Sequence, residues 1–216
     1  MKKRAPVNPS TSGNGKEERL DRIITAALEV FTEFSFQDAT TEEIARRARV
    51  SKRDIYAHFP DKHALLIATL SEALQAEVSN IIKTINRTQR MPSLQKRLEI
   101  VGLTLVNELL SAAMSVLTRL VAAETINQPL IGIVYFENGS VRRTILISKL
   151  LSQHIPSTKM AALDTFQAAE HYLALVTFRP RLTTSIGMHH IWNSESMKTH
   201  VVDAVDCFMR AYPGLD

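Results

Sequence analysis

Residues 40–59 read TTEEIARRARVSKRDIYAHF and decide the fold of this chain, because they contain two helix-start signals in close succession. Thr40 is followed three positions later by Glu43, and Ser51 is followed three positions later by Asp54. Each pair has the spacing of a capping box, in which a hydroxyl and a carboxylate bond the unpaired amides at the start of a helix. The stretch therefore predicts two consecutive helices.

Apolar residues give both predicted helices a side that can be buried. Ile44, Ala45 and Ala48 recur at helical spacing in the first helix, and Ile55 and Phe59 do so in the second. Only two residues separate the helices, so the helices must cross at a steep angle. This is the geometry of a helix-turn-helix.

Cations gather on the other side of the same two helices. Within eight positions the stretch carries five of them, Arg46, Arg47, Arg49, Lys52 and Arg53. In a helix-turn-helix the first residues of the second helix meet base edges, while neighbouring cations and hydroxyls hold phosphates. A basic run alone is more often a solvated surface. Combined with two caps and a two-residue turn, it favours DNA binding.

Residues 20–66 resemble the N-terminal DNA-binding domain of the TetR family of bacterial transcriptional regulators. The resemblance is carried by an apolar helix ending FTEF, the TTEEIARRA helix, and the I-Y-x-H-F-x-D-K stretch that opens a fourth helix. It implies an all-α homodimer that binds a roughly palindromic operator, represses transcription, and lets go when a small ligand enters the C-terminal domain.

By matching positions, the resemblance also implies which residues contact DNA. Thr40, Thr41, Tyr56, His58 and Lys62 would hold backbone phosphates, and Ser51, Lys52 and Arg53 would lie in the groove. Arg46, from the basic run, completes the expected DNA-binding set.

Three positions depart from the family pattern. Ser35 and Arg49 stand where family members usually have glycine. Arg49 occupies a C-cap position that favours a left-handed conformation, which costs a non-glycine residue about 1 kcal/mol. Asp54 replaces a threonine and can either cap its helix or accept from a cytosine amino group, and the cap is favoured. These departures bear on the operator sequence and not on the fold.

The fold class expected is all-α, with a three-helix helix-turn-helix domain followed by a larger helical ligand-binding and dimerisation domain, about nine helices in total. The expected parts are a disordered basic arm at 1–15, the DNA-binding domain at 16–62, and the regulatory and dimerisation domain at 63–216. The arm either adds attraction to phosphates or is a plain tail. A long helix from 62 to about 88 is expected to link the two domains as a lever.

Beyond that linking helix the apolar pattern predicts helices at 94–110, 112–125, 130–153, 160–178 and 191–211. The expected interruptions are Pro129, Pro156, Pro180 and the region of Gly187, with a kink at Asn138 and Gly139. The last two helices are expected to form half of a four-helix dimer interface. Their expected interface residues are Leu163, Phe166, Tyr172, Leu173, Val201, Val205, Phe208 and Met209.

Methionine and aromatic residues of the C-terminal part predict a cavity for an apolar or amphipathic small molecule. The lining residues expected are Met114, Leu117, Val121, Tyr135, Phe136, Phe166, Tyr172 and Phe178, with Arg119 and His171 as ionisable residues drawn inside. For each of these residues taken separately, ordinary core packing is the alternative.

Composition fits this interpretation without proving it. A net charge of +4 and a pI near 9.3 suit a nucleic-acid partner. The single cysteine, Cys207, excludes an intrachain disulfide and indicates a buried thiol in a reducing cytoplasm. No apolar run reaches the length of a membrane span, so no membrane partner is expected.

No enzyme motif is found, so neither catalytic residues nor a cofactor are expected. The adjacent His189 and His190 have no third ligand at helical spacing, and no metal is expected. Two functions stay open: a dimeric repressor released from its operator by a small ligand, or a DNA-anchored protein whose C-terminal domain binds a protein partner. A C-terminal core without a cavity would favour the second.

Overall fold

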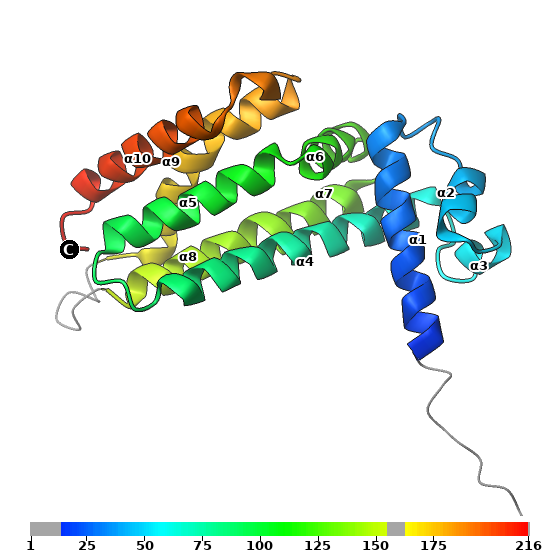
Figure 1. Ribbon diagram of the computed structural model, residues 1–216, viewed down its shortest axis with the longest axis horizontal. Helices are drawn as coiled ribbons and strands as arrows, with labels where there is room; N and C mark the ends of the chain where they lie inside the picture. Colours follow the sequence, from blue (N-terminus) through cyan, green and yellow to red (C-terminus); the bar gives the residue numbers. More distant parts are fainter. Residues whose placement is uncertain (1–13, 155–162, 216) are drawn as a thin grey trace, which may run out of the picture. The chain divides into compact units, whose positions relative to one another are not determined.

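The computed structural model of this protein describes residues 14–154 and 163–215, and these residues form an all-α fold (Figure 1). The helices are α1 (Asn14–Glu33), α2 (Thr41–Ala48), α3 (Lys52–Tyr56), α4 (Lys62–Thr88), α5 (Leu94–Leu110), α6 (Ala112–Glu124), α7 (Pro129–Tyr135), α8 (Arg142–Ser152), α9 (Thr165–Ser185) and α10 (Ser194–Ala211). A π-helical turn, Phe136–Val141, joins α7 to α8, and a 3₁₀ turn, His189–Ile191, precedes α10. The chain divides within α4 into two compact units, at Thr69 and Leu70.

The first unit is built on α1, whose apolar stripe packs against α2. Ile23, Ala27, Val30 and Phe31 follow the helical repeat and are buried. Phe31 also stacks on Phe36, with the ring centroids 5.8 Å apart. This packing holds α2 and α3 on a rigid support.

The second unit has α5 at its centre, in contact with both α9 and α10, which also contact each other. Its core gathers fully buried residues from several helices, among them Leu98, Leu105, Ile147, Tyr172 and Phe208. The Tyr172 hydroxyl donates to the Leu98 carbonyl at 2.7 Å, so this buried hydroxyl is satisfied.

A buried ion pair joins α4 to α8 in the second unit. The Arg143 Nη1 group donates to both carboxylate oxygens of Glu77, at 2.6 and 2.8 Å, and the two side chains are 3% and 1% exposed. Desolvating two charges is costly, and the short bonds offset that cost only while both partners are present.

The irregularity expected at Asn138 and Gly139 is the π-helical turn. A Cβ on Gly139 would lie 3.1 Å from Leu74 Cδ2 and 3.2 Å from Arg143 Nη2, tighter than ordinary contact. Glycine therefore allows α4 to approach this turn closely.

Pro180 does not end its helix, contrary to the sequence expectation: α9 runs through it to Ser185. Proline cannot donate to the carbonyl four residues earlier, which is that of Val176. The Nε2 group of His200, on α10, bonds this Val176 carbonyl at 2.9 Å. A side chain from the neighbouring helix thus replaces the missing hydrogen bond, and α9 ends instead next to Gly187, which has φ 79°.

The helix α4 ends near residue 88 as expected, and the Asp61 carboxylate accepts from the Ala64 amide at its start. Among the described helices it alone has the length and mean hydropathy of a single unbent membrane span. The helix also carries the buried, ion-paired Glu77 and several apolar residues of the core.

Some sequence expectations lie outside the described residues. These are the arm up to residue 13, the break at Pro156, and residues 160–162 of the expected fourth helix of that region. Residues 14 and 15, assigned to the arm from sequence, begin α1.

Candidate nucleic-acid interface

Thr40 and Ser51 both cap their helices as predicted, but a complete capping box is described only for Ser51 and Asp54, because the Glu43 carboxylate binds arginines instead. The Thr40 hydroxyl accepts from the Glu43 amide at 3.2 Å, at the start of α2. At the start of α3 the Ser51 hydroxyl accepts from the Asp54 amide at 3.1 Å, while the Asp54 carboxylate accepts from the Ser51 amide at 3.0 Å. The Ser51 hydroxyl also donates to the Asp54 carboxylate at 2.7 Å, and this bond, followed by that of the Ser51 amide, lowers the pKa of Asp54. Asp54 is therefore the helix cap, as the sequence favoured.

The turn between α2 and α3 is left-handed at Arg49, as expected from its place after the helix. Arg49 has φ 56° and ψ 47°, the only positive φ of a non-glycine residue in the described chain. The Val50 amide reaches back to the Ala45 carbonyl at 3.0 Å and closes the end of α2. Ala45 and Ile55 are buried, so both helices are fixed to the core.

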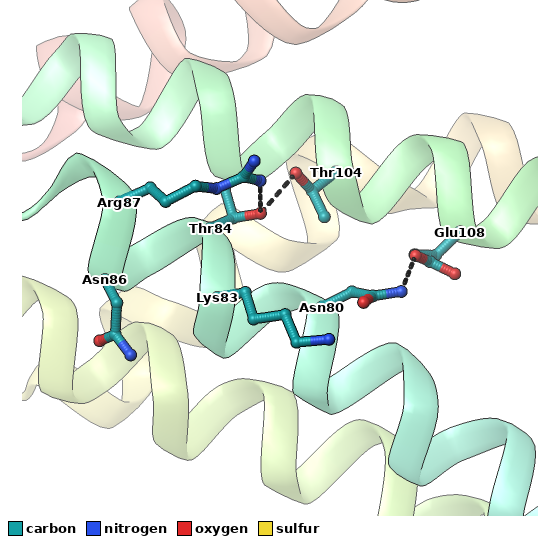
Figure 2. A pocket seen from close by; sticks show the side chains of 7 residues that line it. All are labelled: Asn80, Lys83, Thr84, Asn86, Arg87, Thr104 and Glu108. Carbon is teal, nitrogen blue, oxygen red and sulfur yellow. Dashed lines mark hydrogen bonds between the residues drawn. The ribbon is translucent and has the colours of Figure 1, made fainter.

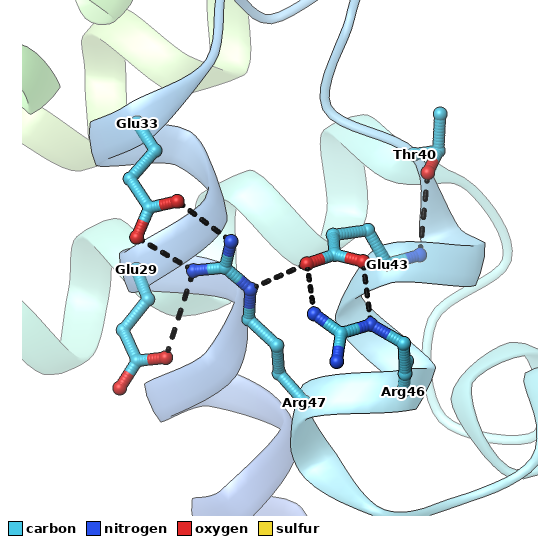
Figure 3. Close-up of polar contacts among 6 residues, drawn as sticks. All are labelled: Glu29, Glu33, Thr40, Glu43, Arg46 and Arg47. Carbon is cyan, nitrogen blue, oxygen red and sulfur yellow. Dashed lines mark hydrogen bonds and ion pairs between the residues drawn. The ribbon is translucent and has the colours of Figure 1, made fainter.

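Acidic side chains bind two of the expected cations (Figure 3). The Nε and Nη2 groups of Arg46 donate to the two carboxylate oxygens of Glu43, at 2.8 and 2.6 Å. Arg47 donates to Glu43 and, through two further bonds of 2.7 and 2.6 Å, to Glu33 on α1. These bonds, Arg46 first, hold the pKa of Glu43 at about 2, so the carboxylate is charged in the folded protein.

The first turn of α3 carries one paired and one unpaired cation. Lys52 pairs with Glu42, and this hydrogen bond raises the pKa of the Lys52 ammonium. The Arg53 side chain is exposed and makes no ion pair with the described residues, and the same holds for Arg49. Arg49 and Arg53 are therefore the cations most available to a polyanion.

Four further residues expected to contact DNA already have contacts within the first unit. The Thr41 hydroxyl is buried and lies 3.3 Å from the Tyr56 hydroxyl, whereas the Tyr56 ring is half exposed. The Lys62 ammonium donates to the carbonyls of Phe36, Gln37 and Ala39 and lies over the Phe36 ring. Lys62 thus closes the loop that precedes α2. His58 is partly buried, with its ring 6.4 Å from that of Phe59.

Sequence reasoning did not assign the acids that neutralise this surface. Glu43 lies three and four residues before Arg46 and Arg47, a spacing that favours ion pairs on a helix and could have been read in advance. Glu33 and Glu42 approach their partners through the tertiary fold, from another helix and across the turn. No spacing along the chain gives that proximity.

The residues expected to line a ligand cavity differ in how far they are exposed. Met114, Leu117, Val121 and Tyr172 are buried and Tyr135 is partly buried. Phe136, Phe166 and Phe178 are 57%, 42% and 69% exposed, and Arg119 and His171 are exposed as well. The spacing of apolar residues predicts that a helix has an apolar face. It does not predict whether another helix covers that face.

A groove between α4 and α5 holds about 600 Å³ and is lined by residues of polar and charged types (Figure 2). The Asn80 amide donates to Glu108 at 2.8 Å, the hydroxyls of Thr84 and Thr104 lie 3.2 Å apart, and Arg87 donates to Thr84. Lys83 extends along the same groove. None of the residues expected from sequence to contact a ligand lines it.

The residues expected at a dimer interface are mostly core residues of their own chain. Tyr172, Val201, Val205 and Phe208 are fully buried within the second unit. The exposed apolar residues of α9 are Phe166, Leu175, Phe178 and Leu182, with Ile186 directly after it. Cys207 is exposed, contrary to expectation, because the core face of α10 is formed by the residues on either side of it.

Comparison with known proteins assigns both parts of the chain. Residues 23–69 match the bacterial regulatory proteins of the tetR family, and residues 96–214 match the C-terminal domain of AefR-like transcriptional repressors. Two regulators of the helix-turn-helix type are similar in sequence over shorter segments. FasR of Mycolicibacterium smegmatis, a transcriptional activator, is 34% identical over 39% of this chain and 38% of its own length. TtgW of Pseudomonas putida is 46% identical over 28% of this chain and 45% of its own length.

The matched segments thus span less than half of each of these relatives. Among solved structures, a chain from Mesorhizobium loti MAFF303099 described as a TetR-family transcriptional regulator aligns with a TM-score of 0.84. That alignment covers 91% of this chain and 97% of the other at 20% identity, which shows the shared fold. The repressor-domain match covers more than half of the chain, and with the helix-turn-helix match it shows that this protein belongs to the TetR family of transcriptional regulators.

Proposed function

We propose that this protein is a homodimeric, sequence-specific DNA-binding repressor that a small ligand releases from its operator. The observation that carries the proposal is the capped α3, whose exposed first turn presents Lys52 and Arg53 while Ile55 fixes the helix to the core. A helix held in this way can enter a major groove without losing its own packing. Repression is supported by the match to the AefR-like repressor domain.

The proposed DNA interface is the set expected from sequence with Arg49 added, and Ser51, which was expected in the groove, is assigned to the DNA backbone instead. Arg53 reads base edges, and Arg49 adds a phosphate contact next to it. Thr40, Thr41, Ser51, Tyr56, His58 and Lys62 position the backbone of the DNA.

Arg46 and Lys52 must share or exchange their acidic partners, Glu43 and Glu42, for phosphates. Exposed ion pairs of this kind contribute little because solvent screens them, so the concentrated charge of a duplex can compete with them. The exchange makes binding strongly dependent on salt.

The homodimer is proposed to form through α9 and α10. The exposed apolar residues Leu175, Phe178, Leu182 and Ile186 support an interface there, because they recur at helical spacing on and just beyond α9 and nothing within the described chain covers them. Two copies related by a two-fold axis would bury this stripe against itself. Two recognition helices would then face two halves of one operator.

The ligand is proposed to bind within the second unit and to act through α4, which runs from the first unit into the second without a break. The residues expected from sequence, from Met114 to Phe178, remain part of this proposal. Like other DNA-binding regulators, the protein is proposed to act in the cytoplasm and to catalyse no reaction.

The base-reading role is tested by measuring the affinity of Arg53→Ala for an operator duplex and for a random duplex by fluorescence anisotropy. Arg90→Ala, which removes an exposed cation after α4, is the matched control. We expect Arg53→Ala to reduce the affinity for the operator duplex about tenfold or more and the affinity for the random duplex much less. Equal losses on both duplexes would exclude base reading by Arg53.

A further inference from the structure

Arg97 is a buried guanidinium with unused hydrogen-bond donors. It lies in the first turns of α5, and only 2% of its surface is exposed. Its Nη1 group bonds the Nε2 atom of His154 at 2.9 Å. Within the described part of the chain, its Nε and Nη2 groups have no hydrogen-bond partner. Buried polar groups are nearly always satisfied, so these two donors call for a partner of their own.

The two unused donors form one edge of the guanidinium. Nε and Nη2 point in the same direction and together match the two oxygens of a carboxylate. The same protein shows this geometry elsewhere: in Arg46, the corresponding two nitrogens bind both oxygens of Glu43, at 2.8 and 2.6 Å. In Arg97 the equivalent edge has no hydrogen-bond partner among the described residues, so its geometry suits a carboxylate in particular.

The surroundings of Arg97 hold it in place without neutralising it. The Nδ1 group of His154 lies 3.0 Å from the Leu150 carbonyl, which can only accept, so Nδ1 donates and the neutral Nε2 accepts from Arg97. The first turn of α5 contains no acid, and the helix start adds positive potential. The nearby Glu99 is bound by Lys96. Burial lowers the pKa of Arg97 from its ordinary value.

We propose that Arg97, held by His154, binds the carboxylate of a small amphipathic organic acid. Leu94 and Val101, three residues before and four after Arg97, are 3% and 0% exposed and belong to the core of the second unit. The apolar part of such an acid would therefore have to displace core contacts of α5 to lie beside Arg97. That this acid is the effector rests on the proposed function. The existence of the site does not.

The site is tested on the intact chain. The ligands are the sodium salts of three carboxylates, namely acetate, benzoate and octanoate, and the comparison probes are 1-octanol and inorganic phosphate. Thermal unfolding and isothermal titration calorimetry are measured for the wild type, Arg97→Met and Arg97→Lys. Arg87→Met serves as the matched control, since it removes an exposed arginine from the groove between α4 and α5. Arg97→Lys keeps the positive charge but removes the paired Nε and Nη2 donors. It replaces Arg97→Met in the comparison if Arg97→Met does not fold.

We expect octanoate to raise the unfolding temperature of the wild type and of Arg87→Met, and 1-octanol and phosphate to leave it unchanged. Because the paired hydrogen bonds are lost, both Arg97 variants should bind octanoate about tenfold to a hundredfold more weakly than the wild type. Without ligand, Arg97→Met should unfold at a higher temperature than the wild type, because an unmatched buried charge is removed.

An octanoate response that survives in both Arg97 variants, or that is lost in Arg87→Met, would overturn the proposal. So would the absence of any Arg97-dependent response to the three carboxylates, or a response to phosphate alone. Duplex DNA binding is measured on the same preparations. A protein that binds octanoate through Arg97 and does not bind DNA would refute the proposed function and leave this site standing.

Discussion

Replacing Arg49 with glycine should stabilise the helix-turn-helix. Arg49 has φ 56° and ψ 47°, a conformation that costs a residue with a side chain about 1–2 kcal/mol. Glycine removes this cost but loses more entropy on folding, by about 0.5–1 kcal/mol. The net gain expected for Arg49→Gly is therefore about 0.5–1 kcal/mol, or about 1–4 °C in unfolding temperature for a chain of this size.

The matched control is Arg49→Ala, which removes the same charge and keeps the strained backbone. The two variants are compared by urea unfolding followed by circular dichroism, with hydrogen exchange of the α2 and α3 amides as a local probe. Arg49→Gly should be the more stable of the two variants. Both should lose the same amount of DNA affinity, and the slope of log K against log salt concentration should become shallower by up to about 0.9 in each. Equal stability of the glycine and alanine variants would refute backbone strain at position 49. Unequal DNA affinity of the two variants would show that Arg49 acts through more than its charge.

Three further predictions concern ionised side chains. Arg143→Met should destabilise the second unit by about 3–5 kcal/mol in urea unfolding, because it leaves the buried Glu77 charge unpaired, and a loss below about 1 kcal/mol would contradict this. The folded pKa of Glu43 is about 2, below its ordinary 4.5, so its stabilising contribution is complete above pH 4.5 and is lost as pH falls towards 2. Unfolding temperatures between pH 2 and 5 should therefore fall less steeply in Glu43→Gln than in the wild type, and parallel curves would exclude this role. Glu42→Gln should free Lys52 and tighten binding to any duplex several-fold at low salt, as measured by anisotropy, and unchanged affinity would show that Lys52 does not reach the DNA.

Local patterns in the sequence predicted the helix-turn-helix because its determinants lie within a few residues of each other. The capping roles of Thr40, Ser51 and Asp54 and the left-handed turn at Arg49 all follow from spacing along the chain. The pairing of Lys52 with Glu42 does not, since it depends on how α2 and α3 cross.

The second unit was harder to predict because its features depend on which helix faces are covered. Phe178 and Tyr172 were both expected to line a cavity, yet Phe178 is exposed and Tyr172 is buried. Pro180 normally signals the end of a helix, but His200 of α10 compensates for its missing donor. The unmatched donors of Arg97 are visible only once its surroundings are known.

The central claim is that two copies of α3 read one palindromic DNA site. Genomic fragments bound by the wild-type protein are selected and the protected bases are then mapped by footprinting. The account predicts two inverted half-sites whose centres lie one helical turn, about 10 base pairs, or a whole multiple of it apart. Protection of a single asymmetric site, or no enrichment of any fragment over random DNA, would contradict it.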